Sequence, residues 1–99
     1  MPITKHHLYT PDINSVSNIF RVLGCPARLT ILKYLLEHGH ANNKQLVEYL
    51  QLKQSTVSEH LKQLISIDFV EASPMENFIR YTINQQAFQN LPLLFHFFE

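Results

Sequence analysis

Hydrophobic residues recur at helical spacing over residues 54–65, between polar positions that also follow a pattern. The hydrophobic residues stand at i, i+4, i+7 and i+8, which is one helix face: Val57, Leu61, Leu64 and Ile65. The other face opens with polar, mostly short side chains: Lys53, Gln54, Ser55, Thr56, Ser58 and Glu59. A buried stripe with a compact polar N-terminal end is typical of a recognition helix, whose first residues enter the major groove of DNA.

Two earlier segments show the same helical periodicity. Hydrophobic positions over residues 11–23 and 26–37 predict two helices. Gly24 and Pro26 separate them, because glycine suits the end of a helix and proline the first turn of the next. Gly39 is expected to end the second helix.

A short third helix is predicted immediately before the candidate recognition helix. Asn42 or Asn43 can cap it, and its hydrophobic residues are Leu46, Val47 and Leu50. Residues 51–53 then form a three-residue turn, and Gln54 or Ser55 begins the fourth helix. A helix, a tight turn and a polar-tipped helix together predict a helix-turn-helix.

A β-hairpin is expected next. Phe69–Ala72 and Phe78–Ile83 have strand-like composition, and the second alternates in hydrophobicity. Residues 73–77 read SPMEN, a loop sequence. A hairpin directly after a recognition helix is the wing of a winged helix.

The C-terminal segment predicts a last helix that cannot be continuous. Asn84 can cap it and Gln85 begins it, but Pro92 lies inside and should kink or break it. The expected fold class is therefore mainly α with a small β-hairpin, a winged helix-turn-helix of about five helices and a two-stranded wing.

Composition narrows the class of protein. The chain has 99 residues, 45% hydrophobic and 16% charged, so we expect one domain over residues 11–99 after an irregular segment over residues 1–10. The single cysteine, Cys25, excludes an internal disulfide and suits a reducing cytoplasm. No signal peptide is visible, and the hydrophobic tail is too short to span a membrane. No catalytic motif or glycine-rich phosphate loop is present, so no enzyme activity and no cofactor are expected.

The charge balance is neutral, with eight basic and eight acidic residues. Neutrality argues mildly against nucleic acid, since affinity comes largely from neutralising phosphates. The placement of the basic residues is more favourable to DNA binding, because four of them cluster around the helix-turn-helix and hairpin: Lys44, Lys53, Lys62 and Arg80. Glu59 and Glu76 lie near the same surface, so we expect moderate, strongly salt-sensitive binding.

Three segments together resemble one known family. Residues 23–32 read LGCPARLTIL, residues 54–64 read QSTVSEHLKQL, and residues 80–83 read RYTI. These resemble the L-x-x-P-x-R-x-x-I-L opening, the Q-S-x-V-S-x-H-L-x-x-L recognition helix and the end of the wing in the ArsR/SmtB family of small winged-helix repressors. The resemblance covers roughly residues 12–91. The helix-turn-helix alone would also fit MarR-like regulators, which are usually longer.

The resemblance implies a homodimer formed through the first and last helices, which binds an imperfect palindrome in double-stranded DNA and represses its own operon. The two ends of the chain hold more hydrophobic residues than one small core can bury. The remainder would form an exposed hydrophobic surface, which usually marks an interface. The candidate interface residues are Ile13, Val16, Ile19, Phe20, Phe88, Leu91, Leu94, Phe95 and Phe98. A two-fold dimer would set its recognition helices about 34 Å apart.

Ten residues are candidates for DNA contact: Lys44, Lys53, Gln54, Ser55, Thr56, Ser58, Glu59, His60, Lys62 and Arg80. Gln54 is suited to adenine, whereas the hydroxyl side chains suit phosphate or the thymine methyl group. The lysines suit phosphate, and Arg80 could reach the minor groove. Glu59 could accept a hydrogen bond from cytosine or repel unwanted DNA.

Several of these residues also have a purely structural interpretation. Ser55 or Thr56 could cap the helix instead, and Arg80 could pair with Glu76. The family's histidine, here His60, is either structural or directed at phosphate. Arg28 matches a family position that ties helices together through its fork of donors. The lysines could simply be solvated.

The family's metal sites are largely missing. One family site uses Cys-x-Cys before the turn, but residues 41–49 contain no cysteine. The other pairs an Asp-x-His with a His-x-x-Glu. His96 and Glu99 match the second half, whereas Ile83 and Gln85 stand at the first. Zinc requires about four N, S or O ligands, so no metal is expected, and His96 and Glu99 are only weak candidates.

Two further functions stay open beside a metal-independent repressor. Cys25 precedes a helix N-terminus, which raises thiol reactivity, so a sensor could respond to an oxidant there or to a ligand in the hydrophobic dimer interface; the effector is unknown. Alternatively, the fold could be a protein-interaction module that uses the phenylalanine-rich tail. Activation rather than repression is also open. The histidines His6, His7, His38 and His40 are interpreted as surface residues.

Overall fold

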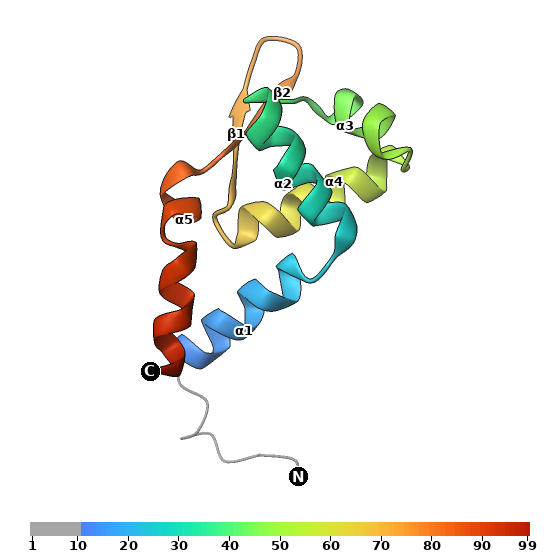
Figure 1. Cartoon of the computed structure of the whole chain (residues 1–99). Coiled ribbons are helices and arrows are strands. Elements are labelled where there is room, and N and C mark those ends of the chain that lie inside the picture. The colour runs from blue at the N-terminus through green and yellow to red at the C-terminus, as the bar shows by residue number, and fades with distance from the viewer. Residues whose placement is uncertain (1–10) are drawn as a thin grey trace.

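The computed structural model describes residues 11–99, and it consists of helices and one short antiparallel hairpin that projects at one end of the molecule (Figure 1). The elements, in chain order, are α1 (Pro11–Leu23), α2 (Pro26–His38), α3 (Asn43–Leu50), α4 (Gln54–Ser66), β1 (Val70–Pro74), β2 (Ile79–Ile83), α5 (Gln85–Gln89) and the 3₁₀ helix η2 (Leu91–Phe98). This mainly helical architecture with a two-stranded wing confirms the expected fold class. The expectation for residues 1–10 lies outside the described residues.

The ends of α2 and α3 follow from local chemistry. α2 begins with Pro26 and ends at Gly39, whose φ of 86° is easily reached only by glycine. The N–H of Gly39 donates to the carbonyl of Leu35 at 2.8 Å. At the start of α3, Asn42 Oδ1 accepts from Gln45 N at 2.8 Å, and Gln45 Oε1 accepts from Asn42 N at 2.9 Å. This capping box settles the alternative between Asn42 and Asn43 in favour of Asn42.

The turn before α4 uses backbone conformation rather than a side-chain cap. Gln51 ends α3 in the left-handed region, with φ 57°, and its N–H donates to Val47 O at 2.9 Å. Lys53 is the N-cap residue of α4 and makes no side-chain cap hydrogen bond. The prediction that Ser55 or Thr56 could cap this helix is therefore wrong, because α4 already begins at Gln54.

The wing is slightly displaced from its predicted bounds. Strand β1 begins at Val70 rather than Phe69, because the N–H of Phe69 donates to Leu64 O at 3.1 Å and closes the end of α4. The strand continues to Pro74, which is tolerated at a sheet edge. Val70 pairs with Ile83, and Pro74 pairs with Ile79. The loop is consequently shorter than predicted.

A backbone bridge joins the wing to the helix-turn-helix. The N–H of Ala41 donates to Tyr81 O at 3.1 Å, and the N–H of Tyr81 donates to Ala41 O at 2.8 Å. Ala41 is fully buried. The segment between α2 and α3 is therefore fixed to β2, which lies between it and β1.

The C-terminal helix is broken as predicted. Asn84 Oδ1 accepts from Ala87 N at 3.4 Å, and α5 ends at Gln89. The chain continues as the 3₁₀ helix η2, with Pro92 in its first turn. Pro92 cannot donate to the carbonyl four residues earlier, which prevents a continuous α-helix. No helix within residues 11–99 is long and hydrophobic enough to cross a membrane.

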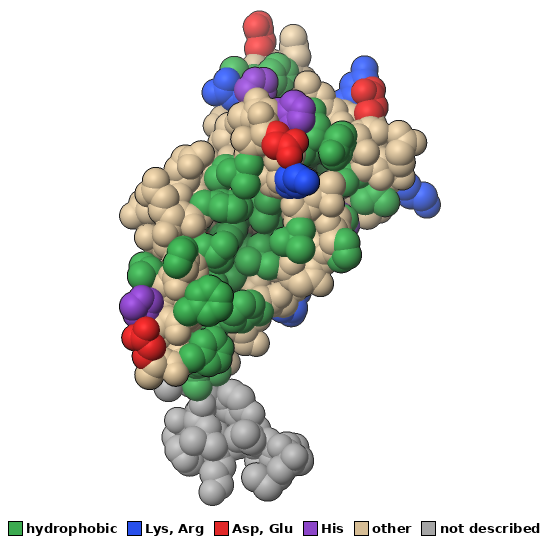
Figure 2. All heavy atoms as spheres, viewed as in Figure 1, with side chains coloured by type: hydrophobic (Ala, Val, Ile, Leu, Met, Phe, Trp, Pro, Cys, Tyr) green, Lys and Arg blue, Asp and Glu red, His purple; other side chains and the backbone are tan. Residues whose placement is uncertain are grey.

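The core lies where α1, α2, α3, α4 and the wing meet. Its largest fully buried side chains are Ile31, Leu35, Leu46, Leu61, Leu64, Val22, Val57 and Val70. Figure 2 shows hydrophobic side chains gathered in a band across the middle of one face, down to the junction of α1 and the C-terminal segment, while charged side chains gather mainly near the wing and helix-turn-helix. On this face most charged side chains thus lie apart from the hydrophobic band.

Candidate nucleic-acid interface

The buried stripe of α4 fixes which side of that helix faces outward. Val57, Leu61 and Leu64 are at most 1% exposed and belong to the core. Leu46 of α3 is also fully buried, so both helices of the helix-turn-helix are anchored from beneath. The polar positions between these residues consequently lie on or near the surface.

Most of the predicted DNA-binding side chains are solvent-exposed. The exposed group comprises Lys44, Lys53, Gln54, Ser55, Ser58, Glu59 and Lys62. Thr56, His60 and Arg80 are half-buried. The first group therefore provides a surface with hydrogen-bonding and cationic groups at the N-terminal part of α4.

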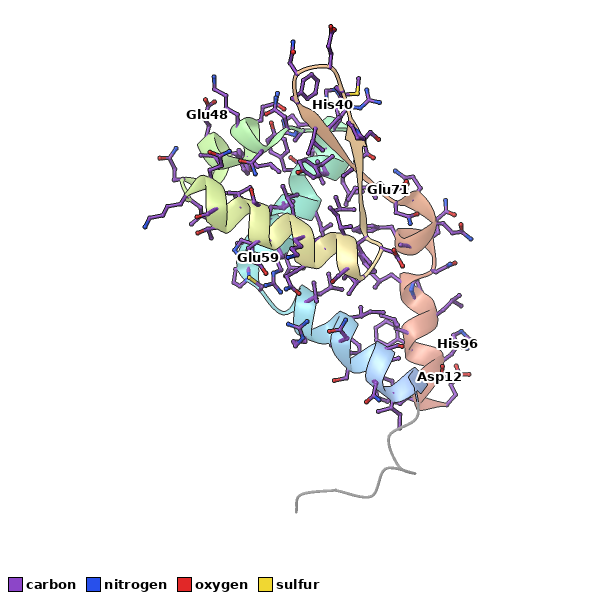
Figure 3. All side chains as sticks on the ribbon, turned by 180° about the vertical axis from the view of Figure 1, so that it is seen from behind. Asp12, His40, Glu48, Glu59, Glu71 and His96 are labelled. Atoms are coloured by element: carbon purple, nitrogen blue, oxygen red, sulfur yellow. The ribbon has the colours of Figure 1, made fainter. Side chains whose placement is uncertain are left out.

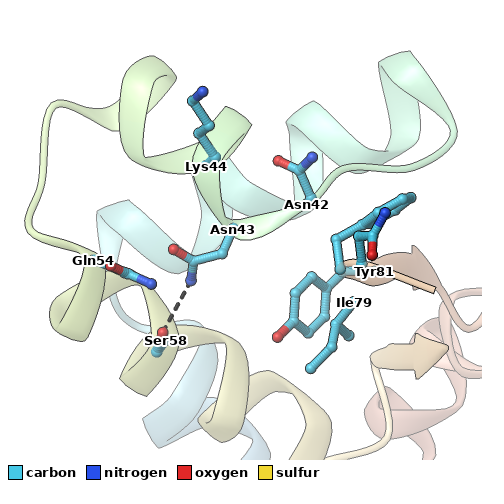
Figure 4. Close-up of a pocket in the computed structure, with 9 residues that line it drawn as sticks. Asn42, Asn43, Lys44, Gln54, Ser58, Ile79 and Tyr81 are labelled. Carbon is cyan, nitrogen blue, oxygen red and sulfur yellow. Dashed lines mark hydrogen bonds between the residues drawn. The ribbon is translucent and has the colours of Figure 1, made fainter. Parts of the chain in front are cut away.

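A cavity of about 420 Å³ lies between this surface and the wing (Figure 4). Its lining residues are Asn42, Asn43, Lys44, Gln54, Ser58, Asn77, Phe78, Ile79 and Tyr81. Across it, Asn43 Nδ2 donates a hydrogen bond to Ser58 Oγ at 2.9 Å. The helix-turn-helix and the wing thus line one concave surface, rich in amide groups on one side and in large hydrophobic groups on the other.

Glu59 belongs to a polar network that leads along α4 away from this cavity. Gln63 Nε2 donates to Glu59 Oε1 at 3.1 Å, and Arg21 Nη2 donates to Gln63 Oε1 at 3.3 Å. The same guanidinium donates to Asn18 Oδ1 at 2.8 Å. Figure 3 shows Glu59 on α4, well separated from Glu48 and Glu71. Glu59 is therefore held by neighbours on its own helix and, through them, by α1.

His60 lies on the inner side of α4 and contacts α2. Arg28 Nε donates to His60 Nδ1 at 3.1 Å, and Arg28 Nη1 donates to Val22 O at 3.2 Å. Burial and the neighbouring Arg28 charge lower the pKa of His60, partly opposed by Glu59. This arrangement favours the structural role for His60, and it shows Arg28 tying together α1, α2 and α4 as expected.

Arg80 does not make the surface pair that was its structural alternative. Among residues 11–99, no ion pair joins it to Glu76. Its Nε is buried and has no hydrogen-bond partner in this part of the chain. The backbone of Arg80 pairs opposite Ser73 in the wing, so the residue is positioned by the hairpin.

The weak metal candidates bond to each other. His96 Nδ1 lies 3.2 Å from Glu99 Oε2, and both side chains are mainly exposed. Figure 3 shows His96 at the end of the molecule where the C-terminal segment meets α1. Within the described residues, no three His, Cys, Asp or Glu side chains gather as a metal site would require. His6 and His7 lie outside those residues.

Cys25 is the N-cap residue of α2, as its sequence position predicts, but its side chain makes no cap hydrogen bond. It is half-buried and is a free thiol. No other cysteine exists in the chain to form an intramolecular disulfide with it.

The hydrophobic residues of the predicted dimer interface divide into three groups. Ile19, Phe88 and Leu91 pack against the core, and the ring centroids of Phe69 and Phe88 are 5.4 Å apart. Ile13, Val16 and Leu94 are half-buried. Phe20, Phe95 and Phe98 are exposed, by 45%, 67% and 69%.

Sequence reasoning missed several residues that line the cavity beside α4. Asn43 was considered only as a helix cap, and the side chains of Asn77, Phe78 and Tyr81 were considered only as part of the hairpin. The periodicity of one segment cannot reveal contacts that form when the wing folds back. The signal in the sequence that could have indicated these contacts was the short spacing between the helix-turn-helix and the hairpin.

Comparison with known proteins identifies the family to which this chain is similar. The family described as "Bacterial regulatory protein, arsR family" matches residues 25–72. The arsenical resistance operon repressor of Staphylococcus xylosus is 34% identical over 83 residues, which cover 80% of this chain and 79% of that protein. The probable mercury resistance operon repressor of Streptomyces lividans is 30% identical over 84 residues, which cover 85% of this chain and 65% of that protein.

A solved structure shares the fold. The homodimeric winged helix-turn-helix DNA-binding domain of a Mycobacterium bovis protein superposes with a TM-score of 0.75 at 21% identity, covering 95% of this chain and 86% of that one. The winged helix is thus supported by geometry and the family by sequence. The chain belongs to the arsR family of bacterial regulatory proteins, which are DNA-binding transcriptional regulators rather than enzymes.

Proposed function

We propose that the protein is a dimeric repressor that binds an imperfect palindrome upstream of its own operon and reads it with the N-terminal end of α4. The observation that carries the proposal is the orientation of α4. Its hydrophobic stripe is buried, while Gln54, Ser55 and Ser58 are exposed, and Gln54 and Ser58 line the cavity beside the wing. These are the side-chain types that recognise base edges and phosphates.

The proposed division of labour follows from side-chain chemistry. Gln54 offers both a donor and an acceptor, as adenine requires for a bidentate contact. Ser55, Thr56 and Ser58 are short enough to approach phosphate or the thymine methyl group. Arg80 extends from the wing toward the minor groove. Because His60 is bonded to Arg28, it acts by holding α4 in place.

The proposed electrostatic contribution is local rather than global. Lys44, Lys53 and Lys62 are exposed around the helix-turn-helix and each is suited to one phosphate. The formal net charge of zero provides no general attraction to DNA. Binding should therefore depend on a small number of phosphate contacts and weaken steeply as salt rises.

The proposed dimer forms through α1 and the C-terminal segment. Phe20, Phe95 and Phe98 leave large hydrophobic surfaces in water, and burying them against a second copy would be favourable. A two-fold axis there would present two copies of α4 about one DNA turn, or roughly 34 Å, apart.

We place the proposed DNA binding in the cytoplasm, where DNA is accessible and Cys25 stays reduced.

The relatives named for arsenical and mercury resistance raise the question of a metal effector. We propose that this chain binds DNA without one, because His96 and Glu99 provide only two ligands and Cys25 only one.

The experiment is a fluorescence anisotropy titration of a labelled DNA fragment from upstream of the protein's own gene. It includes excess competitor DNA, several salt concentrations and parallel samples with added zinc. Saturable, competitor-resistant binding that falls steeply with salt and ignores zinc supports the proposal. Release of the DNA on addition of zinc would overturn the proposal that binding does not depend on a metal. Absence of specific binding at low salt contradicts the repressor and favours the protein-interaction module with the hydrophobic tail as its surface.

A further inference from the structure

The side chain of Asn43, in the first helix of the helix-turn-helix, makes a hydrogen bond to the second helix. Its Nδ2 donates to Ser58 Oγ at 2.9 Å, as the dashed line in Figure 4 shows. Capping of α3 is already performed by Asn42. The side-chain amide of Asn43 is therefore not needed to start the helix and is available for another role.

The hydrogen bond decides what the Ser58 hydroxyl can do. A serine hydroxyl has one hydrogen to donate and two lone pairs that accept. One lone pair of Ser58 Oγ is occupied by Asn43, so the hydrogen points elsewhere. Ser58 is exposed. Its donor is therefore presented to whatever lies against this surface.

Two other hydroxyl groups in the helices, those of Thr30 and Ser66, are used differently. Thr30 Oγ1 donates to Pro26 O at 2.8 Å, and Ser66 Oγ donates to Gln63 O at 2.6 Å. Such bonds to the helix backbone consume the donor. Across residues 11–99, no carbonyl or side-chain acceptor takes the hydrogen of Ser58 in this way.

We propose that Asn43 is a positioning residue that fixes the Ser58 hydroxyl as a hydrogen-bond donor toward an acceptor atom on DNA. This inference rests on the proposed function. The acceptor is a base-edge atom, such as purine N7, guanine O6 or thymine O4, or a phosphate oxygen. The amino groups of adenine and cytosine are donors, so they cannot accept the Ser58 hydrogen.

The other end of the Asn43 amide supports a role beyond packing. Asn43 Oδ1 is buried and has no hydrogen-bond partner among the described residues. An unpaired buried acceptor is costly, and most buried polar atoms are paired. The amide thus uses only its donor side, and that side faces the recognition helix.

A double-mutant cycle tests whether Asn43 acts through Ser58. Affinity for the upstream fragment is measured for the wild type, Asn43→Ala, Ser58→Ala and the double variant. We expect Asn43→Ala to weaken binding about 5- to 10-fold in the wild-type background and to have no further effect in the Ser58→Ala background. Effects that multiply would overturn the inference, as would wild-type affinity for Asn43→Ala.

A reversal of the hydrogen bond provides a second test. In Asn43→Asp, the carboxylate can only accept, so the Ser58 hydroxyl turns inward and its outward donor is lost. Asn42→Asp is the matched control, because it adds the same charge one residue earlier and aspartate caps a helix as well as asparagine. We expect Asn43→Asp to bind DNA about tenfold more weakly than Asn42→Asp. Equal affinities would show that charge alone accounts for the effect and would contradict the inference.

Modified DNA identifies the acceptor. Base analogues that each lack one acceptor atom, and methylphosphonates that each remove one phosphate charge, are placed singly in the bound fragment. At the true acceptor, wild-type protein should lose affinity and the penalty of Ser58→Ala should disappear. A penalty that persists at every position overturns the donor role. Thermal unfolding of each variant verifies that it is folded.

The proposed function and the role of Asn43 can be contradicted by different results. If wild-type protein binds no DNA specifically, the proposed function is wrong. If wild-type protein binds and the two alanine substitutions act independently, the proposed function stands and only the role of Asn43 is wrong.

Discussion

Arg28 Nε donates a hydrogen bond to His60 Nδ1 across 3.1 Å, which joins α2 to the middle of α4. The same guanidinium reaches Val22 O at 3.2 Å, at the end of α1. Because Nδ1 accepts, His60 must be neutral with its proton on Nε2. The position of the proposed DNA-reading helix therefore depends on an uncharged imidazole.

This contact predicts a pH dependence of stability. The folded state lowers the pKa of His60 from 6.5. At pH values between 6.5 and that lower pKa, the unfolded chain therefore binds more protons than the folded protein. Stability then falls as the pH drops below about 6.5 and levels off beneath the folded-state pKa. Urea unfolding midpoints at a series of pH values measure this.

A matched histidine variant isolates the contribution of His60. In His60→Gln, the decline in unfolding free energy below pH 6.5 should become shallower. In His40→Gln, which changes an exposed histidine, it should keep the wild-type slope. Identical slopes in the wild type and His60→Gln would contradict the coupling between His60 and Arg28.

Gly39 provides a test of backbone conformation free of steric effects. Its φ is 86°, and a Cβ added there would meet nothing within 4 Å. Gly39→Ala should therefore destabilise the protein by about 1 kcal/mol through the backbone alone. Glu37→Ala, on the exposed surface of the same helix end, should change stability by less than about 0.5 kcal/mol. Chemical denaturation of both variants measures the difference, and an unchanged midpoint for Gly39→Ala would be inconsistent with the observed helix end.

Much of the fold could be predicted because its signals are local. The stripe of Val57, Leu61 and Leu64 predicted a buried helix face, and all three side chains are in the core. The break at Pro92 was equally predictable, since the missing N–H acts within one turn. The bounds of α2 follow from proline and glycine, and the starts of α3 and α5 follow from asparagine, at their expected positions.

The candidate site was less accessible to sequence reasoning, because its geometry depends on long-range packing. Nothing local to Asn43 indicates that it will bond to Ser58, which lies in another helix. The bridge between Ala41 and Tyr81 brings the wing beside that pair, and it also forms only in the folded chain. The N-terminal capping of α4 was mispredicted for a different reason: a helix can begin on backbone conformation alone.

Lys53 tests the proposed interactions with phosphate. It is exposed at the N-cap of α4, so Lys53→Gln should leave one phosphate per subunit without its cation. The slope of log affinity against log salt should become shallower by about 0.9 for each phosphate that is no longer neutralised, or about twice that in a dimer. Lys33→Gln, on the exposed surface of α2, is the control and should leave the slope unchanged. Equal slopes for all three proteins would exclude Lys53 from the interface.

Phe95 tests the proposed dimer. It is 67% exposed in the C-terminal segment, and Phe95→Glu would place a charge in the buried interface, which is costly. We expect this variant to sediment as a monomer where the wild type sediments as a dimer. Met75→Glu changes an exposed hydrophobic residue of the wing and should stay dimeric. A dimeric Phe95→Glu would place the interface elsewhere.

The most direct measurement compares two double substitutions at opposite ends of α4. Gln54→Ala with Ser58→Ala removes the proposed reading groups, whereas Gln63→Ala with Ser66→Ala removes the same residue types near the C-terminal end of the helix. Competitor-resistant affinity for the upstream fragment should fall at least 30-fold in the first protein, on the order of 1–3 kcal/mol for each recognition contact, and by less than about threefold in the second. Equal affinities of the two proteins would contradict recognition by the N-terminal end of α4.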